Sequence, residues 1–131
     1  MKKPHDTLPD TELEVMDAVW ALPNPVSTGQ IKRELDKQRT WNLSALQTLL
    51  NRLIERGFVS AEKKDNKRYF SALIKHDEYR TRANRSFLER VNGNSVKSFV
   101  ASLYDGNALS DADLKELESF ISEKLNASKD K

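Results

Sequence analysis

Residues 41–57 carry six large aliphatic side chains at helical spacing, and this pattern constrains the fold more than any other part of the chain. They are Leu43, Leu46, Leu49, Leu50, Leu53 and Ile54. On a helix of 3.6 residues per turn these positions form one apolar stripe that docks on a core. Asn42 is placed to cap this helix and Gly57 to end it. We therefore predict a helix that is buried along one side.

The opposite face of the predicted helix is polar but carries little charge, whereas a solvent-facing helix more often shows Glu and Lys. Its residues are Ser44, Ala45, Gln47, Thr48, Asn51 and Arg52. Such side chains suit a DNA major groove: amides bond base edges, hydroxyls reach bases or phosphates, and Ala contacts a thymine methyl. We predict that all of them except Arg52 contact bases. Arg52 is expected to hold a phosphate or to pack across the helix. The alternative is a packed helix whose polar face is incidental.

Residues 58–73 have the pattern of a β-hairpin with a basic tip that contains Asp65 and Asn66. Four cations surround the turn: Lys63, Lys64, Lys67 and Arg68. Clustered cations beside a DNA-reading helix favour contact with the phosphate backbone, because counterion release rewards it. The alternative is a solvated basic hairpin. Tyr69 and Phe70 point to opposite faces, so we expect one of them in the core.

The charge of the chain is unevenly distributed. Its net charge is only +2. Residues 30–75 contain 11 basic and 5 acidic side chains, a net charge of +6. The positive charge therefore gathers on the predicted polar helix and hairpin, as in a nucleic-acid-binding protein.

Two shorter helices precede these elements. Asp10 is expected to cap a helix over residues 11–21, and Ser27 to cap one over residues 28–37, with Gln30 completing a capping box. The order helix, helix, helix, hairpin predicts a winged helix-turn-helix over roughly residues 8–75. We thus predict a mainly α protein whose DNA-binding domain is 1–75.

The two tryptophans are expected to be structural. Trp20 ends the apolar face of the first helix, and Trp41 directly precedes the third. The alternative for Trp41 is a hydrogen bond from its indole N–H to a DNA phosphate.

Residues 76–131 predict a second domain of three helices. Asp77 is expected to cap a helix to about Asn92, a short helix spans 95–104, and Ser110 with Asp113 opens the last helix, whose tail 126–131 is expected to fray. Three helices of about 50 residues are too few to enclose a core alone. We therefore predict a homodimer with a shared core. Its residues are Phe87, Val96, Phe99, Val100, Leu103, Leu114, Leu117, Phe120 and Ile121.

Several classes of protein are disfavoured by the sequence. The chain has no cysteine, which excludes disulfides and thiolate metal sites. Its two histidines, His5 and His76, have no spaced partners for metal binding or nucleophilic catalysis. The carboxylates fall mainly in first turns of helices, where helix dipoles account for them. We expect no enzyme, metal or cofactor. Without a signal peptide or membrane span, we expect a soluble, cytoplasmic protein.

Taken together, these residues resemble the penicillinase repressor (BlaI/MecI-type) family of bacterial transcription regulators. The most specific motif is Gln47-Thr48-Leu49-Leu50-Asn51-Arg52-Leu53. Further matches cover nearly the whole chain: Leu13-Glu14-Val15-Met16, Val19-Trp20, Trp41, Arg56-Gly57, Arg68-Tyr69, Ser86-Phe87-Leu88 and Leu109-Ser110.

The resemblance implies an N-terminal winged helix, a C-terminal dimerisation arm, and repression through inverted repeats, often with TACA and TGTA, in promoters of resistance genes. It further implies release of the repressor when a membrane-bound sensor metalloprotease detects β-lactam and the arm is cleaved, by the sensor or by a downstream protease.

The chain departs from the family pattern at two places. Ala45 stands where members usually carry Thr, which alters one expected base contact. Ser102-Leu103 stands where some members are cut at an Asn-Phe bond, so these two residues mark the candidate cleavage site. Two rival interpretations remain open: a repressor of another operon with a different inducer, and a winged helix that binds a protein.

Overall fold

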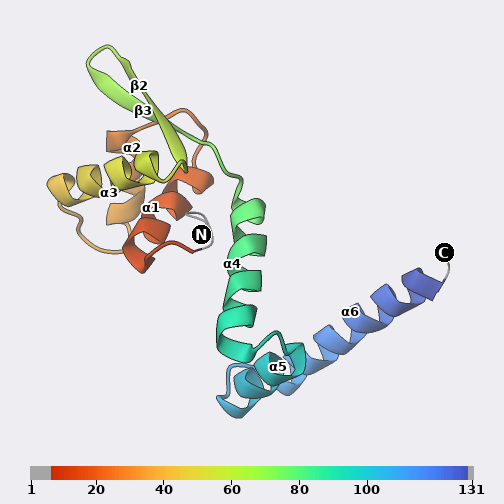
Figure 1. Cartoon of the computed structure of the whole chain (residues 1–131). Helices are drawn as coiled ribbons and strands as arrows, with labels where there is room; N and C mark the ends of the chain where they lie inside the picture. The colour runs from red at the N-terminus through yellow and green to blue at the C-terminus, as the bar shows by residue number, and fades with distance from the viewer. Residues whose placement is uncertain (1–6, 130–131) are drawn as a thin grey trace. The chain divides into compact units, whose positions relative to one another are not determined.

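Six helices and one small sheet make up residues 7–129, the part of the chain that the structure, a computed structural model, describes (Figure 1). In chain order they are α1 (Asp10–Ala21), β1 (Val26–Ser27), α2 (Thr28–Asp36), α3 (Leu43–Glu55), β2 (Val59–Lys64), β3 (Lys67–Ala72), α4 (His76–Asn92), α5 (Val96–Asp105) and α6 (Asp111–Lys129). The chain divides inside α4, after Ser86, into two compact units. The first contains the predicted order helix, helix, helix, hairpin, so this prediction is confirmed.

The sheet of the first unit has three antiparallel strands in the order β1-β3-β2. Figure 1 shows β2 and β3 as a hairpin that extends beyond the three helices; we call this hairpin the wing. β1 pairs Val26 with Phe70 and Ser27 with Tyr69. The sequence did not predict β1, since a strand of two residues is too short to show a period-two pattern.

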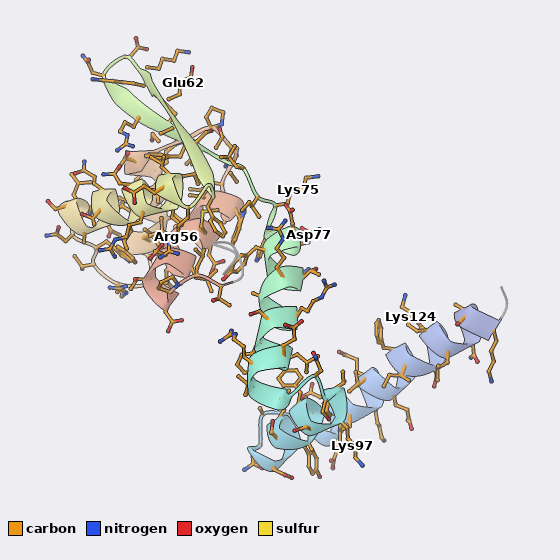
Figure 2. All side chains as sticks on the ribbon, viewed as in Figure 1. Arg56, Glu62, Lys75, Asp77, Lys97 and Lys124 are labelled. Atoms are coloured by element: carbon orange, nitrogen blue, oxygen red, sulfur yellow. The ribbon has the colours of Figure 1, made fainter. Side chains whose placement is uncertain are left out.

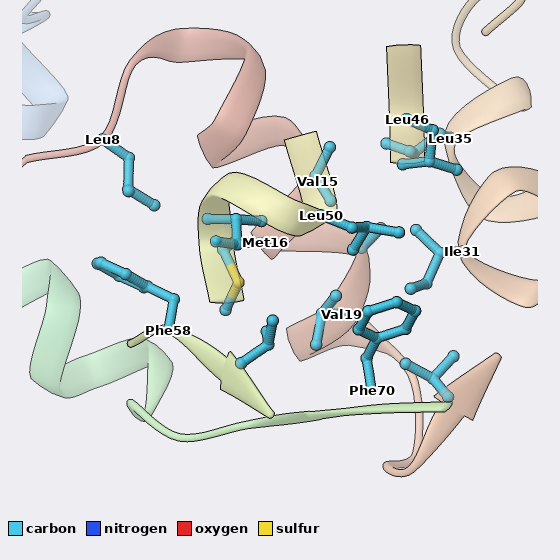
Figure 3. Packing of buried hydrophobic residues seen from close by; sticks show 14 of the residues in the cluster. Leu8, Val15, Met16, Val19, Ile31, Leu35, Leu46, Leu50, Phe58 and Phe70 are labelled. Atoms are coloured by element: carbon cyan, nitrogen blue, oxygen red, sulfur yellow. The ribbon is translucent and has the colours of Figure 1, made fainter. Parts of the chain in front are cut away.

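The core of the first unit lies between α1, α2, α3 and the base of the sheet. Figure 3 shows its side chains converging from these elements. Phe58, Met16 and Ile31 are among those with no exposed surface. Phe70 is also fully buried, whereas Tyr69 is half-buried, as expected from their alternation on β3. The apolar stripe of α3 contributes Leu46, Leu50 and Leu53.

Three predicted caps are present. The Ser27 hydroxyl accepts a hydrogen bond from the Gln30 backbone N–H, and the Gln30 side chain accepts one from the Ser27 N–H. The Asn42 side chain accepts one from the Ala45 N–H at 3.0 Å. Ser110 and Asp113 form the same reciprocal pair as Ser27 and Gln30.

Other predicted helix ends were wrong. α1 includes Asp10, and the preceding Pro9 supplies the carbonyl that accepts the Leu13 N–H, so Asp10 is no cap. Pro9 is the N-cap residue, where its missing N–H removes no hydrogen bond of the helix. α4 begins at His76, which places Asp77 in its first turn. The tail is helical through Lys129 rather than frayed, while residues 130 and 131 lie outside the described range.

Glu12 lies in the first turn of α1, but it does more than complement the helix dipole. Its side chain is buried at 2% exposure, and its Oε1 lies 2.7 Å from Nε of Arg56, which is labelled in Figure 2. A buried carboxylate requires a charged or hydrogen-bonding partner. The pair therefore joins α1 to the residue that caps the C-terminal end of α3.

The junction between the sheet and α4 is held by aromatic side chains. The Trp20 indole N–H donates to the Ile74 carbonyl at 2.9 Å, and the ring stacks on His76 with centroids 4.6 Å apart. The Tyr79 hydroxyl accepts a hydrogen bond from the Leu8 N–H at 2.7 Å. Trp20 is thus structural, as expected.

The second unit has little core of its own. Phe87 and Phe99 meet edge to face, with centroids 6.0 Å apart. No described residue of α5 or α6 is buried. Large apolar side chains are instead exposed along this unit: Phe87, Val91, Val96, Tyr104, Phe120, Ile121 and Leu125.

Candidate nucleic-acid interface

The polar residues predicted to contact DNA share one exposed face of α3. Ser44, Ala45, Gln47, Thr48, Asn51 and Arg52 are all exposed, and the buried leucines of the same helix lie on the other side. The Thr48 hydroxyl donates to the Ser44 carbonyl at 3.1 Å, which leaves its oxygen lone pairs to accept. The face therefore offers amide and hydroxyl groups at successive turns of one helix.

Leu43 was expected in the apolar stripe, but it is 47% exposed. Leu43 is the first residue of α3, and the buried part of the helix begins one turn later, at Leu46. Leu43 lies one turn before Gln47, and both side chains line a groove between α2, α3 and the wing. The exposed face of α3 therefore begins with an apolar side chain.

A groove of about 640 Å³ separates the start of α2, the start of α3 and the wing. Five basic side chains line it, and no acidic one does: Lys32, Arg33, Lys63, Lys67 and Arg68. The uncharged lining residues are Ser27, Thr28, Gly29, Leu43, Gln47 and Asn66. The N-terminus of α2 adds the positive end of its dipole to this field. The groove can therefore hold a polyanion beside the polar face of α3.

The wing is a tight hairpin. Asp65 and Asn66 have φ values of 52° and 64°, the left-handed pair that a two-residue hairpin turn requires. Directly opposite each other on the two strands are Lys63 and Arg68, and then Lys64 and Lys67. Like charges in such cross-strand pairs repel. A bound anion would relieve this repulsion.

Three of the four predicted wing cations line the groove, and Lys64 does not. Lys64 lines a different concavity with Glu62, Asp65 and Tyr69. Glu62 is labelled on the wing in Figure 2. Carboxylates beside Lys64 make its surroundings less favourable to phosphate than those of Lys67.

Arg68 differs from its basic neighbours because it contacts α3. Its Nη1 donates to Asn51 Oδ1 at 3.1 Å, and its guanidinium carbon lies 5.1 Å from the centroid of the Phe70 ring. The sequence predicted both residues as DNA contacts but not their bond. A contact across 17 positions between a helix and a hairpin leaves no periodic pattern.

A second concavity, of about 510 Å³, lies along α3 at Ala45, Thr48 and Arg52. It also contains Arg39 and Thr40, which sequence reasoning missed. These two residues belong to the irregular segment before α3, where no helical or strand spacing marks a face. They place another cation and another hydroxyl beside the polar helix.

Trp41 was expected to be structural, with a hydrogen bond from its indole N–H to a DNA phosphate as the alternative. Trp41 is 5% exposed, and its Nε1 is buried with no hydrogen-bond partner among the described residues. Arg39 covers its ring, with the guanidinium carbon 4.4 Å from the centroid. Trp41 is therefore a structural residue beneath Arg39.

The turn between α2 and α3 is held by Asp36. Its carboxylate bonds the Lys32 ammonium at 2.7 Å and accepts the Trp41 backbone N–H at 3.0 Å. The hydrogen bond from Lys32, followed by that from Trp41, lowers the pKa of Asp36 below its ordinary value. These contacts fix the entry of the chain into α3.

Residues 7–129 were also compared with two other kinds of feature, a metal site and a membrane-spanning helix. No group of three His, Cys, Asp or Glu side chains there is arranged to hold a metal ion. Within the same range no helix is both long and apolar enough to cross a membrane.

The chain is similar to known proteins in sequence and, over its first unit, in fold. A family model described as penicillinase repressor matches residues 8–123. The penicillinase repressor of Bacillus licheniformis is 30% identical over 121 residues, which cover 92% of this chain and 94% of that protein. The methicillin resistance regulatory protein MecI of Mammaliicoccus sciuri is 30% identical over 115 residues, covering 86% and 91%. The solution structure of the DNA binding domain of the repressor BlaI matches with a TM-score of 0.51 and 32% identity, covering 60% of this chain and 92% of that structure.

Proposed function

Because the chain belongs to the penicillinase repressor family, we propose that it is a sequence-specific, DNA-binding transcriptional repressor of β-lactam-resistance genes. The observation that carries this proposal is the basic groove that adjoins the exposed amide and hydroxyl face of α3. A protein with this task acts in the cytoplasm on double-stranded DNA and needs no catalytic group or cofactor.

In this proposal α3 is the recognition helix and lies in the major groove. Gln47, Thr48 and Asn51 set the sequence preference, with Ser44 and Ala45 as lesser contacts. The phosphate contacts are Arg52, Lys63, Lys64, Lys67 and Arg68. The lining of the groove favours Lys63 and Lys67 over Lys64 for this role. Arg39 joins them on the other flank of α3, next to Arg52.

The proposal assigns DNA binding to residues 1–75 and dimerisation to residues 76–131. The support comes from the second unit, which begins at Phe87 within that range: α5 and α6 bury no side chain there, and the apolar groups named above face outward. An isolated chain gains by covering such a surface with an identical one. Two recognition helices would then enter successive major grooves about 34 Å apart, which matches an inverted repeat.

Cleavage of the arm would end repression, because the two half-sites would no longer be bound by one molecule. The candidate bond between Ser102 and Leu103 lies inside α5. The Ser102 carbonyl accepts from Gly106, and the Leu103 carbonyl accepts from Ala108. A protease that takes extended substrate would need this last turn of α5 to open first. Mass spectrometry of the chain recovered from β-lactam-treated cells, with a membrane sensor protease present or deleted, tests this step.

Fluorescence anisotropy tests the central proposal. A labelled duplex with a TACA/TGTA inverted repeat is compared with a scrambled duplex at two salt concentrations. We expect tight binding to the repeat only, two chains per duplex and a steep salt dependence. Equal, weak binding to both duplexes would show that the operator of this protein has a different sequence. No binding at either salt concentration would contradict the proposal and favour a protein partner.

A further inference from the structure

The bond between Arg68 and Asn51 joins the wing to the exposed face of α3. Resting on the proposed function, we propose that Arg68 is a positioning residue that fixes the amide of Asn51 so that this amide reads adenine. Arg68 would thus determine sequence preference at one base pair of each half-site without touching that base pair.

The chemistry of the pair fixes the orientation of the amide. A guanidinium has only donors, so the group that faces Arg68 must be the Asn51 oxygen. The 3.1 Å bond from Nη1 to Oδ1 has this arrangement. If the amide flipped, its NH₂ group would face the guanidinium, and two donors would oppose each other. Arg68 therefore selects one of two orientations that a solvent-exposed asparagine otherwise exchanges freely.

The selected orientation leaves a defined pattern for DNA. Among the described residues, no other hydrogen bond involves the Asn51 side chain, so both hydrogens of Nδ2 can donate and the second lone pair of Oδ1 can accept. Adenine presents the complement in the major groove, an acceptor at N7 next to a donor at N6. Guanine presents two acceptors there and cannot satisfy the oxygen of Asn51.

Arg68 is itself held in place. Its guanidinium packs over the ring of Phe70, which has no exposed surface, and Arg68 is half-buried. Lys cannot reproduce this arrangement, because an ammonium has neither the planar face for the ring nor the fork of donors. Lys67 also lines the groove but is exposed, and no hydrogen bond joins it to α3 within the described residues. Lys67 is therefore the matched control.

The experiment selects binding sites from a library of random duplexes with the full-length chain. It compares the wild type with Asn51→Ala, Arg68→Ala, Arg68→Lys, the double variant Asn51→Ala/Arg68→Ala, and Lys67→Ala. We expect the wild type to select adenine at one position of each half-site, and Asn51→Ala and Arg68→Ala to lose the preference at that same position. The double variant should lose no more there. Lys67→Ala should keep every preference.

Anisotropy then measures discrimination between the selected duplex and one with guanine in place of that adenine. We expect a ratio of affinities on the order of tenfold in the wild type and in Lys67→Ala. The ratio should fall close to one in Arg68→Ala and in Arg68→Lys. Circular dichroism checks that each variant is folded, and Arg68→Lys, which keeps the charge, serves if Arg68→Ala does not fold.

Two results would overturn the inference while the proposed function stands. One is an Arg68→Lys variant that keeps the full discrimination, or an Arg68→Ala variant that behaves as Lys67→Ala does; Arg68 would then contact phosphate only. The other is a wild type that prefers a base other than adenine at the position that depends on Asn51. A wild type that selects no motif would instead contradict the proposed function itself.

Discussion

Nε of Arg56 lies 2.7 Å from Oε1 of Glu12, and this ion pair couples the first helix of the chain to the end of α3. Glu12 is almost fully buried, whereas about a third of the Arg56 side chain is exposed. Removing one member of such a pair leaves the other charge without a partner in the core. The pair therefore matters for stability chiefly through the penalty that its loss would impose.

We predict that Arg56→Ala lowers the free energy of unfolding by about 3 kcal/mol, near the lower end for breaking a buried pair because Arg56 is partly exposed. Urea denaturation monitored by tryptophan fluorescence measures this. Arg82→Ala is the control, since Arg82 pairs with Glu78 at 2.9 Å on the surface and should cost less than about 1 kcal/mol. Equal losses in the two variants would show that the burial of Glu12 has no energetic consequence.

A pH-dependent contribution to stability is expected from Asp36. Hydrogen bonds from Lys32 and from the Trp41 N–H lower the pKa of this carboxyl in the folded chain. A lowered folded-state pKa stabilises the fold above the unfolded-state value, near 3.9, and this stabilisation is lost as the pH falls through the folded-state value. The free energy of unfolding should therefore fall below about pH 4, and less steeply in Asp36→Asn. Identical slopes in both proteins would contradict this account of the turn before α3.

Much of this architecture was predictable because its causes are local. The stripe of α3, the caps at Ser27, Asn42 and Ser110, and the turn at Asp65-Asn66 each depend on residues a few positions apart. The contacts that define the interface more finely are not local. The Arg68–Asn51 bond and the Glu12–Arg56 pair span 17 and 44 positions, and no periodicity reveals such pairs. Leu43 was misplaced because periodicity cannot tell where the core ends along a helix.

The surroundings of Trp41, a candidate site residue, also depend on contacts that are distant in the sequence. The sequence indicated that a tryptophan directly before a DNA-reading helix could donate to a phosphate. In the structure, Arg39 covers the ring of Trp41, and Arg39 itself pairs with Glu14 of α1 at 3.1 Å. Which side of a residue faces solvent depends on such tertiary neighbours.

The dimer proposal predicts that Phe120→Asp yields monomers. Phe120 is 55% exposed on α6, so the substitution places a charge in the proposed shared core without opening a cavity in the chain itself. Sedimentation velocity measures the state of the protein. Ser119→Asp, at the neighbouring exposed position, adds the same charge and should leave the dimer intact. A dimer that survives Phe120→Asp, or a monomeric wild type, would contradict the interface.

The central claim is that the exposed face of α3 reads base sequence, and Gln47→Ala tests it most directly. The measurement is the ratio of affinities for a selected operator and for scrambled DNA, with Gln38→Ala as control, since Gln38 is exposed after the end of α2 and outside the groove. We predict that Gln47→Ala loses about 1–3 kcal/mol of binding to the operator and none to scrambled DNA, while Gln38→Ala loses neither. An unchanged ratio in Gln47→Ala, or an equal loss on both duplexes, would contradict the claim.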